Sequence, residues 1–429
     1  MKIGLISLGC DKNRVDSEKM LYALSQAGYE ITDNEKEADV MIINTCAFIE
    51  PAKKEAIDVI LEIAELKKSS LKKLVVTGCA ATRYKAELSE GIPEIDAIVP
   101  VKDEINIVKE INGLFGMPSS ETKEGRILTT LPHYAYLKIA DGCNNRCSYC
   151  SIPLIRGKYA SEPIEKLVEE ARTLNESGVK ELILVAQDTT AYGIDLYKKY
   201  ALCDLLKELV KIDFWRIRLL YAYPELVTEE LVDFIDKEPK MAKYLDIPMQ
   251  HADNEILKKM RRRSTAEDLD RLTERLRKCE NHIAIRSTFI VGFPTESRKN
   301  VRTLKAFLKN KLDYAGFFEF SPEENTPAYN MDGKIPKRVA KMRKTECEKI
   351  QCKSTAFWQE RLVGQTVDVI YEGIDYEKNL FFGRTEYCAP EIDTKVFFSA
   401  TFAPEVGNVY KIKIEKNKFN LYGKAQEEE

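Results

Sequence analysis

Apolar segments of strand length alternate with helical segments along most of this chain of 429 residues, and this alternation limits the folds that it can adopt. In the first third of the chain the pattern predicts strands at 2–8, 40–44 and 74–77. It also predicts a helix at 17–26, capped by Asp16 or Ser17, and another helix that begins near Pro51. Strands joined through helices form parallel sheets with right-handed crossovers. We therefore expect an N-terminal α/β domain with a βαβαβ pattern.

The same alternation continues through the middle of the chain, with helical segments such as 163–177 and 265–279 between the strands. The strands predicted here are 135–140, 182–186, 216–221, 245–248, 284–291 and 314–320. Repeated βα units of this length build a parallel barrel or an open part of one. The middle of the chain is therefore expected to form a partial, TIM-like (βα)6 barrel, which a long helix at 337–360 follows.

Each of the first three predicted strands is followed by a cysteine, namely Cys10, Cys46 and Cys79. Ligands gather beyond the carboxyl ends of the strands in open parallel sheets, so three thiols placed there are expected to converge on one point. A buried cysteine is also a common small apolar core residue, and that alternative suits any one of the three. Their equivalent positions favour an iron–sulfur cluster over coincidence, and three ligands would leave one of its irons open.

A second set of cysteines, Cys143, Cys147 and Cys150, has the spacing C-x-x-x-C-x-x-C. Three thiolates at this spacing can hold three irons of a 4Fe–4S cluster and leave the fourth iron open for a substrate or cofactor. The alternative is a zinc site, which needs a fourth ligand, and only His133 lies close enough in sequence to supply one. The spacing, directly after the apolar stretch 136–140, resembles the signature of radical S-adenosylmethionine (SAM) enzymes.

The two sets together resemble those of the methylthiotransferases, and this resemblance covers essentially the whole chain. It implies two 4Fe–4S clusters, one on each set, with S-adenosyl-L-methionine as a further cofactor. It also implies an N-terminal methylthiotransferase cluster domain at 1–117, a linker at 118–132, a radical SAM core at 133–358, and a TRAM domain, a small OB-like β-barrel, at 361–427. The remaining cysteines match no part of the family pattern and are interpreted as packing residues: Cys203, Cys279, Cys347, Cys352 and Cys388.

The chemistry of such barrels lies on the loops at the carboxyl ends of their strands. By resemblance, Gln187, Gln250 and the turn at Gly292 lie near the bound SAM, since glycine admits a close backbone approach and amides bridge polar edges. Taken singly, each is also an ordinary polar turn residue. His251 is interpreted as a hydrogen-bonded structural residue without a role in proton transfer. The chain departs from the family pattern at Glu162, where arginine is common, and at Thr295, where glycine is common.

The overall charge argues against a nucleic-acid-binding protein, because the formal net charge is −3 and the sequence pI is near 6.0, whereas such domains are often strongly basic. The basic run 258–263 is the main exception and is interpreted as a solvated helix end. The apolar part of the N-terminal segment is too short for a secretion signal. Eleven cysteines then indicate metal or redox chemistry in the cytoplasm rather than disulfides.

The C-terminal region is expected to form a small β-barrel that in many relatives binds RNA. Its predicted strands are 366–371, 380–383, 395–399 and 409–414. From Arg361 to the end, nine Lys or Arg stand against twelve Asp or Glu, a net charge of −3. Since the last three residues are all Glu, the barrel itself is close to neutral. That charge suits a protein substrate, in particular a basic ribosomal protein, better than a polyanionic tRNA.

Segments 7–18, 187–193 and 245–252 resemble the RimO branch of the methylthiotransferases, which modifies an aspartate of small-subunit ribosomal protein twelve. The resemblance implies that one electron cleaves SAM at the second cluster and that the resulting radical abstracts hydrogen from the aspartate β-carbon. The first cluster would then supply the methylthio group. An unactivated C–H bond of this kind is beyond any side-chain base, which is why a radical is needed.

The expected partners are ribosomal protein twelve, free or in an assembling subunit, and a low-potential reductant such as flavodoxin. Neither a membrane nor tRNA is expected. Two alternatives remain at this point. One is a tRNA adenosine methylthiotransferase with the same two clusters, which would bind tRNA with a steep salt dependence. The other is a non-catalytic iron–sulfur module, which would not turn SAM over under reducing conditions.

Overall fold

The computed structural model describes residues 1–118 and 124–426, and these residues form two compact units. The first unit contains the described residues of Met1–Thr129 together with Tyr136–Ala160 and Ser321–Tyr329. The second contains Thr130–Ala135, Ser161–Phe320 and the described residues from Asn330 onward. The linker predicted at 118–132 and the domain predicted at 361–427 lie partly outside the described residues.

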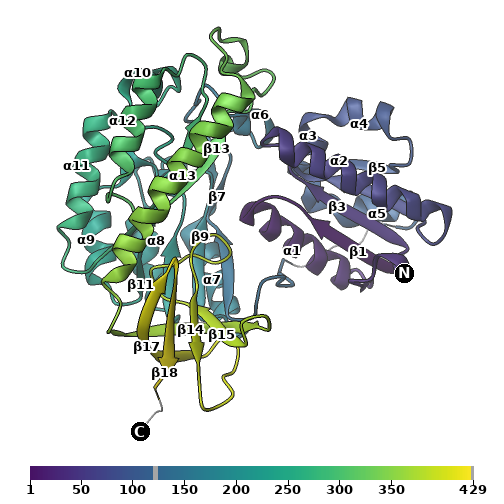
Figure 1. Ribbon diagram of the computed structural model, residues 1–429. Coiled ribbons are helices and arrows are strands. Elements are labelled where there is room, and N and C mark those ends of the chain that lie inside the picture. Colours follow the sequence, from purple (N-terminus) through teal and green to yellow (C-terminus); the bar gives the residue numbers. More distant parts are fainter. Residues whose placement is uncertain (119–123, 427–429) are drawn as a thin grey trace. The chain divides into compact units, whose positions relative to one another are not determined.

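The first unit is built on a parallel sheet with the strand order β2-β1-β3-β4-β5 (Figure 1). Its strands are β1 (Lys2–Ser7), β2 (Glu30–Ile31), β3 (Val40–Thr45), β4 (Lys73–Thr77) and β5 (Ala97–Pro100). The helices between them are α1 (Asp11–Gln26), α2 (Glu50–Glu65), α3 (Gly78–Arg83), α4 (Lys85–Gly91) and α5 (Ile107–Leu114). The register pairs Ile3 with Val40 and Val40 with Lys73, so the carboxyl ends of β1, β3 and β4 meet at one edge.

Helices cover both faces of this sheet, and the alternation of side chains along the strands decides which helix each residue meets. Met41 and Ile43 of β3 pack in one cluster with Ile60 and Ile63 of α2 and with residues of α3 and α4. Their neighbours on the same strand pack on the opposite face, in a cluster with residues of α1 and α5. That second cluster includes Val40, Ile42, Met20, Leu24, Ile107 and Ile111. The βαβαβ prediction is confirmed as a three-layer α/β sandwich.

The predicted start of the first helix is wrong. Helix α1 begins at Asp11 with Cys10 as its N-cap residue, six residues earlier than expected. Asp16 and Ser17 lie inside the helix and are both buried. Ser17 Oγ donates to Ser7 Oγ at 2.9 Å and accepts a hydrogen bond from Asn44 Nδ2 at 2.9 Å. Their polar groups therefore serve contacts across the sheet edge instead of capping the helix.

The second unit contains the partial barrel, whose sheet has the strand order β13-β12-β11-β10-β9-β6. Its strands are β6 (Tyr134–Lys138), of which Tyr134 and Ala135 belong to this unit, β9 (Glu181–Val185), β10 (Arg216–Leu219), β11 (Met241–Asp246), β12 (Ala284–Val291) and β13 (Tyr314–Glu319). All six predicted strands are present, with ends shifted by up to four residues. Strand β12 was predicted with its observed bounds.

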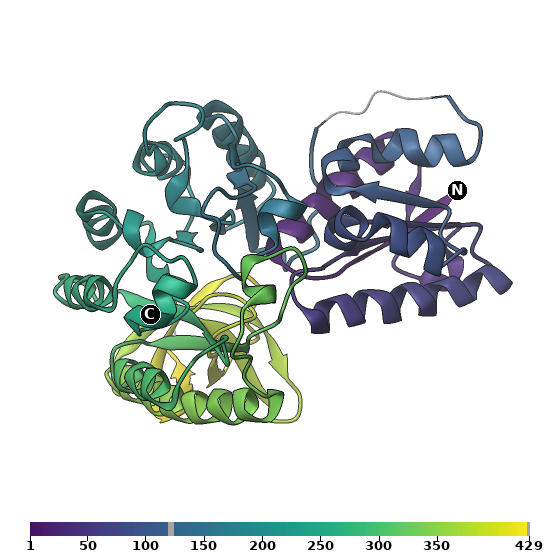
Figure 2. The same cartoon turned by 90° about the horizontal axis from the view of Figure 1, so that it is seen from above.

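Helices line the outer side of these strands (Figures 1 and 2). They are α7 (Ile164–Glu176), α8 (Leu202–Leu209), α9 (Glu229–Lys237), α10 (Asn254–Lys259), α11 (Ala266–Arg277), α12 (Arg298–Leu308) and α13 (Lys337–Glu360). Helix α13 has the predicted bounds, and α11 and α12 each begin with a capping box, at Thr265 and Ser297. These caps satisfy backbone N–H groups that the first turn leaves open.

The C-terminal strands close into a barrel in the order β14-β15-β16-β18-β17. They are β14 (Thr366–Asp375), β15 (Leu380–Arg384), β16 (Val396–Ser399), β17 (Val409–Lys418) and β18 (Asn420–Ala425). Four of them were predicted and β18 was not. Only Phe419 separates β17 from β18, and it makes the turn with a φ of +68°. The prediction ended the preceding strand at 414 and did not recognise this tight turn.

Within the second unit, a buried ionic network joins this C-terminal barrel to the strands of the partial barrel. Glu181, the first residue of β9, accepts hydrogen bonds from Arg218 Nε and Arg384 Nη2, both at 2.7 Å. Arg384 Nε also donates to Glu372 Oε1 at 2.7 Å, and Arg218 is 0% exposed. Burial alone would raise the pKa of Glu181, but the two guanidinium charges more than offset it and lower this pKa to about 2.

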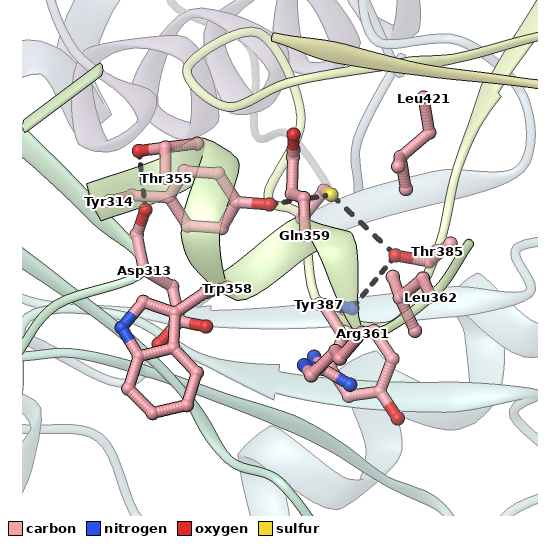
Figure 3. A pocket seen from close by; sticks show the side chains of 11 residues that line it. Asp313, Tyr314, Thr355, Trp358, Gln359, Arg361, Leu362, Thr385, Tyr387 and Leu421 are labelled. Carbon is pink, nitrogen blue, oxygen red and sulfur yellow. Dashed lines mark hydrogen bonds between the residues drawn. The ribbon is translucent and has the colours of Figure 1, made fainter. Parts of the chain in front are cut away.

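Helix α13 contributes a second contact to the C-terminal barrel, around a small cavity (Figure 3). Tyr314 Oη lies 3.3 Å from Cys388 Sγ, and Gln359 Nε2 reaches Thr394 Oγ1. Cys388 and Cys347 are buried, as the packing prediction requires. The prediction is wrong for Cys352, which is exposed on α13, because the helix presents that position to solvent.

None of the helices in residues 1–118 and 124–426 is both long enough and apolar enough to span a membrane.

Glu181→Ala should destabilise the second unit by about 3–5 kcal/mol, because it leaves two buried guanidinium groups without their shared carboxylate. The chain has two tryptophans, and both, Trp215 and Trp358, belong to the second unit. Urea unfolding followed by tryptophan fluorescence therefore reports on this unit. The exposed pair Lys207–Glu230 supplies the control, since Glu230→Ala should cost at most about 1 kcal/mol. Equal effects of the two substitutions would contradict the assigned role of the network.

Candidate active site

The first three cysteines lie at the carboxyl ends of adjacent strands in the first unit. Cys10 follows β1 and caps α1, Cys46 directly follows β3, and Cys79 is the second residue of α3 after β4. Backbone N–H groups at the start of a helix carry partial positive charge, which favours a thiolate placed there. Strand order therefore puts all three cysteines at one edge of the sheet, and Cys10 and Cys79 also lie at helix starts, which suit anionic ligands.

Two glycines allow these cysteine loops to approach one another. A Cβ atom at Gly9 would lie 3.1 Å from Cys46 Sγ, and one at Gly78 would lie 2.3 Å from Asn44 Oδ1. Both glycines have positive φ, +96° and +89°, a conformation that costs glycine little. The loops around Cys10, Cys46 and Cys79 therefore depend on glycine at two crossing points.

The three thiols are close enough to influence one another electrostatically. The pKa of Cys79 is raised to about 12, mainly by burial and to a smaller extent by Cys10 and Cys46, while the charge of Arg156 offsets part of the increase. Burial likewise raises the pKa of Cys46, which the backbone N–H groups of Phe48 and Ala47 partly offset. Burial therefore favours the neutral thiol form of Cys46 and Cys79, and binding of iron would release their protons.

The second cysteine set forms one closed loop in the same unit, after β7 (Ala140–Asp141) and before α6 (Ile152–Ile155). The loop closes where Cys143 N donates to Gly157 O at 3.2 Å. Gly142 makes this possible, because a Cβ there would lie 2.2 Å from Lys158 O. Within the loop, Cys150 N donates to Cys147 O at 3.2 Å. The spacing of Cys143, Cys147 and Cys150 is thus built into a single tight turn structure.

A cluster of buried charges joins the two cysteine sets inside the first unit. Lys138, just before β7, pairs with Asp16 of α1 and with Asp141 of β7, the latter at 3.1 Å. Arg156, just after α6, pairs with Asp141 at 2.6 Å and with Asp16 at 3.0 Å. Burial alone would raise the pKa of Asp141, but Lys138 and Arg156 hold it well below its usual range. These ion pairs fix the second cysteine loop on α1, whose N-cap residue is Cys10.

Segment 321–329 makes a second connection between the two sets. Glu323, 2% exposed, accepts hydrogen bonds from Arg83 Nη1 at 2.7 Å and from Lys53 Nζ at 3.1 Å. Arg83 ends α3, four residues after Cys79. At the other end of the segment, Ala328 N donates to Ser148 O at 2.8 Å, between Cys147 and Cys150. Both cysteine loops are therefore braced by the same segment.

None of these bracing residues was predicted as part of the site, and Asp16 was predicted only as a helix cap. The partners are far apart in sequence, 122 residues for Lys138 and Asp16 and 240 for Arg83 and Glu323. A single sequence carries no signal for such pairings. The only local signal in the sequence was the presence of charged residues near the cysteines, such as Asp141 and Arg156.

Each cysteine set supplies three thiols, which is the donor set of a 4Fe–4S cluster with one open iron. In residues 1–118 and 124–426, no group of three or more His, Cys, Asp or Glu side chains could hold a metal ion. A 4Fe–4S cluster needs a wider arrangement, because each thiolate binds a different iron. His133, the possible fourth zinc ligand, belongs to the second unit and its Nε2 lies 3.2 Å from Glu372 Oε1.

The residues predicted to lie near SAM belong to the second unit, at the carboxyl ends of its strands. Gln187 follows β9, Gln250 follows β11, and Gly292 directly follows β12. Gln250 has a φ of +72° and bridges to β12, with its N donating to Thr288 O and its O accepting from Ile290 N, both at 2.8 Å. The turn at Gly292 has a φ of +74°. Two of the three residues therefore sit in a constrained backbone.

Glu296, which the sequence analysis did not single out, fixes this turn. It is 1% exposed, and its Oε2 accepts a hydrogen bond from Gly292 N at 2.8 Å and another from Arg343 Nη1. His251 Nε2 lies 3.2 Å from Glu296 Oε1, and Asp253 N donates to His251 Nδ1 at 3.1 Å. His251 has hydrogen-bond partners on both ring nitrogens, in keeping with its interpretation as a structural residue.

The basic run 258–263 is only partly a solvated helix end. Arg262 is buried, its guanidinium stacks 3.8 Å from the ring centre of Tyr223, and its Nη2 donates to Pro248 O at 2.8 Å.

Thr295, one of the two departures from the family pattern, adopts a φ of +67° and donates its N–H to Gly333 O at 2.8 Å. Glycine would adopt this conformation more easily, which explains why the family commonly has it there.

Comparisons with known proteins match three successive regions of the chain. Residues 2–100 match the model of "Uncharacterized protein family UPF0004", residues 137–308 that of the radical SAM superfamily, and residues 363–425 that of the TRAM domain. A ribosomal protein uS12 methylthiotransferase RimO from Thermoanaerobacter sp. (strain X514) is 46% identical over 407 residues, 92% of this chain and 93% of that protein. The RimO protein of Clostridium botulinum (strain Eklund 17B / Type B) is 46% identical over 442 residues, 100% and 98% of the two chains. The chain belongs to the RimO family.

Membership in this family confirms the radical SAM methylthiotransferase class predicted from the two cysteine sets. The fold class is confirmed as well, with parallel α/β sheets and a closed C-terminal barrel. Among solved structures, the radical SAM methyltransferase TsrM from Kitasatospora setae superimposes with a TM-score of 0.56 at 17% identity, over 76% of each chain. At that identity the likeness shows the fold alone.

The pH dependence of the first unit should depend on Glu104, beside the first cysteine set. Its Oε1 accepts a hydrogen bond from Thr77 Oγ1 at 2.9 Å, and burial, with a smaller effect of Asp16, raises its pKa from 4.5 to about 8. Between these values the folded chain binds a proton that the unfolded chain has lost. The contribution of Glu104 to stability is therefore lost progressively as the pH rises from about 4.5 to about 8.

We expect Glu104→Gln to stabilise the first unit at pH 8, by up to a few kcal/mol, and to leave it nearly unchanged at pH 5. Urea unfolding read by hydrogen exchange of peptides from β3 and β4 measures this unit. The same gain at both pH values would mean that Glu104 is not the titrating group.

Proposed function

We propose that the chain adds a methylthio group to the β-carbon of an aspartate in small-subunit ribosomal protein twelve. The observation that carries this proposal is the 46% identity, over nearly the full length of both chains, to relatives named ribosomal protein uS12 methylthiotransferase. The nearly neutral C-terminal barrel supports it, since a tRNA-binding version should be basic. The proposed substrate is a protein, and tRNA is not a partner.

In this proposal Cys143, Cys147 and Cys150 hold a 4Fe–4S cluster with one open iron, and Cys10, Cys46 and Cys79 hold a second. When bound, the clusters supply the electron that cleaves SAM and the site at which the transferred sulfur is held. The protein supplies the geometry, because Cys10 is the N-cap residue of α1 and the second cysteine loop is anchored on the same helix. A rigid connection of this kind keeps two reacting centres at a fixed separation.

Further residues have proposed roles in binding. Gln187, Gln250 and the turn at Gly292 would contact SAM, and Glu296 would keep the turn open through its hydrogen bond to Gly292 N. A Cβ at Gly292 would lie 2.5 Å from Ala340 Cβ, so the turn has no room for a larger residue. The carboxylate of Glu296 holds the backbone and takes no proton in this proposal.

A low-potential reductant such as flavodoxin would supply the electron, and a cytoplasmic location suits both this donor and a ribosomal substrate. The eleven cysteines all lie in described residues, and none of them forms a disulfide there, which suits reducing conditions. We propose domain boundaries at 1–117, 133–358 and 361–427. These domains are continuous in sequence, whereas the two compact units each combine separate segments of the chain.

The deciding experiment offers ribosomal protein twelve and tRNA together to the reconstituted protein, with SAM, sulfide and a reductant. We expect mass spectrometry to find one methylthio group on an aspartate of the ribosomal protein and none on tRNA. Modification of tRNA alone would contradict the proposed substrate while leaving the two-cluster chemistry intact. Absence of SAM turnover in a chain loaded with iron would contradict the enzymatic proposal itself.

Single cysteine variants should separate the roles of the two sets. Cys143→Ala should reduce 5′-deoxyadenosine to the level of a protein-free control, because one iron of the SAM-binding cluster loses its thiolate. Cys10→Ala should still form 5′-deoxyadenosine but should transfer no methylthio group. Cys352→Ala, which alters an exposed cysteine outside both sets, is the matched control and should retain both products. Loss of both products in Cys10→Ala would contradict this division of roles.

A further inference from the structure

Asn13 lies at the centre of the first cysteine site, although it is not a ligand. Its side chain is fully buried, and its Nδ2 donates to Leu8 O at 3.0 Å and to Thr45 O at 2.9 Å. Leu8 stands two residues before Cys10, and Thr45 stands one residue before Cys46. A single side-chain amide therefore uses both of its N–H donors to fix two cysteine loops.

The oxygen of the same amide faces the third cysteine and a cation. Asn13 Oδ1 lies 3.7 Å from Cys79 Sγ and accepts a hydrogen bond from Arg156 Nη2 at 2.6 Å. Since one oxygen contacts both groups, the guanidinium of Arg156 lies beside the sulfur of Cys79. All three cysteine positions of the first set are thus connected through Asn13 to Arg156.

Arg156 comes from the other cysteine set, six residues after Cys150. Its side chain is 2% exposed and is held from two sides, by Asp141 at 2.6 Å and by Asp16 at 3.0 Å. Asp141 itself stands two residues before Cys143. The guanidinium fork is suited to such a position, because it is planar and always charged and can donate to three acceptors at once. It has little freedom to move away from Cys79.

From this geometry we propose that Arg156 is a positioning residue that orients Cys79 through Asn13 and raises the reduction potential of the cluster held by Cys10, Cys46 and Cys79. The inference rests on the proposed ligand assignment. A cluster becomes more negative when it is reduced, so a fixed positive charge beside one ligand sulfur favours the reduced form.

The charges around Arg156 determine the direction of the effect. Two cations, Arg156 and Lys138, face two anions, Asp16 and Asp141, so the group is neutral as a whole. Removing the guanidinium leaves a net charge of −1 in a buried region next to Cys79.

The test uses the full chain with Cys143, Cys147 and Cys150 all replaced by Ala, so that the remaining cluster is the one in question. Iron and sulfide content are measured first, and then the midpoint potential by EPR-monitored titration with dithionite. In this background Arg156→Gln should shift the ratio of oxidised to reduced cluster by about tenfold or more, which for one electron is about 59 mV towards lower potential. Arg156→Lys, which keeps the charge, should recover a large part of the shift.

Arg126→Gln is the matched control, because Arg126 is also a buried arginine of the first unit paired with a carboxylate, Glu18. It should leave the potential unchanged. A loss of iron in Arg156→Gln but not in Arg126→Gln would support the positioning role. An unchanged potential in Arg156→Gln, or an equal shift in Arg126→Gln, would overturn the inference. A parent chain without iron would instead overturn the ligand assignment of the proposed function, and the inference with it.

Discussion

The buried ion pairs among Asp16, Asp141, Lys138 and Arg156 are the interaction on which the rest of the site depends. Burying four charges is unfavourable unless each one meets an opposite charge at short range. Here each cation contacts both anions. Burial by itself would lower the pKa of Lys138, but the two carboxylates raise it above its usual range. Because these charges come from α1 and from both sides of the second cysteine loop, satisfying them determines where that loop lies.

Much of the fold could be predicted from the sequence, because the strands of parallel sheets are continuous apolar segments separated by amphipathic helices. The six strands of the partial barrel and helix α13 follow this rule. The errors lie where tertiary contacts override the local pattern. Asp16 resembles a helix cap, but it sits in the second turn of α1 because its carboxylate pairs with Arg156. Strand β18 was missed because a single residue, Phe419, separates it from β17.

The ligand candidates were also predictable, since spacing alone identifies Cys143, Cys147 and Cys150, and strand ends identify the other set. The residues that brace them were not. Asn13 is an ordinary polar residue in the sequence, and only the structure places its amide between Leu8 O, Thr45 O and Arg156. The contacts with Thr45 and Arg156 join positions 32 and 143 residues apart in the chain, and a single sequence has no local pattern that encodes them. Exposure of individual helix positions, as for Cys352, is equally hard to infer.

The discontinuous first unit has a consequence for synthesis on the ribosome. Its sheet and the first three cysteines are complete within about the first hundred residues, but Glu323, which pairs with Arg83 and Lys53, is made much later. Domains generally fold from the N-terminus as the chain emerges. Until the segment around Glu323 arrives, the nascent domain carries two unpaired cations beside its cysteine loops. The first unit can therefore complete its packing only late in translation, after most of the partial barrel has been made.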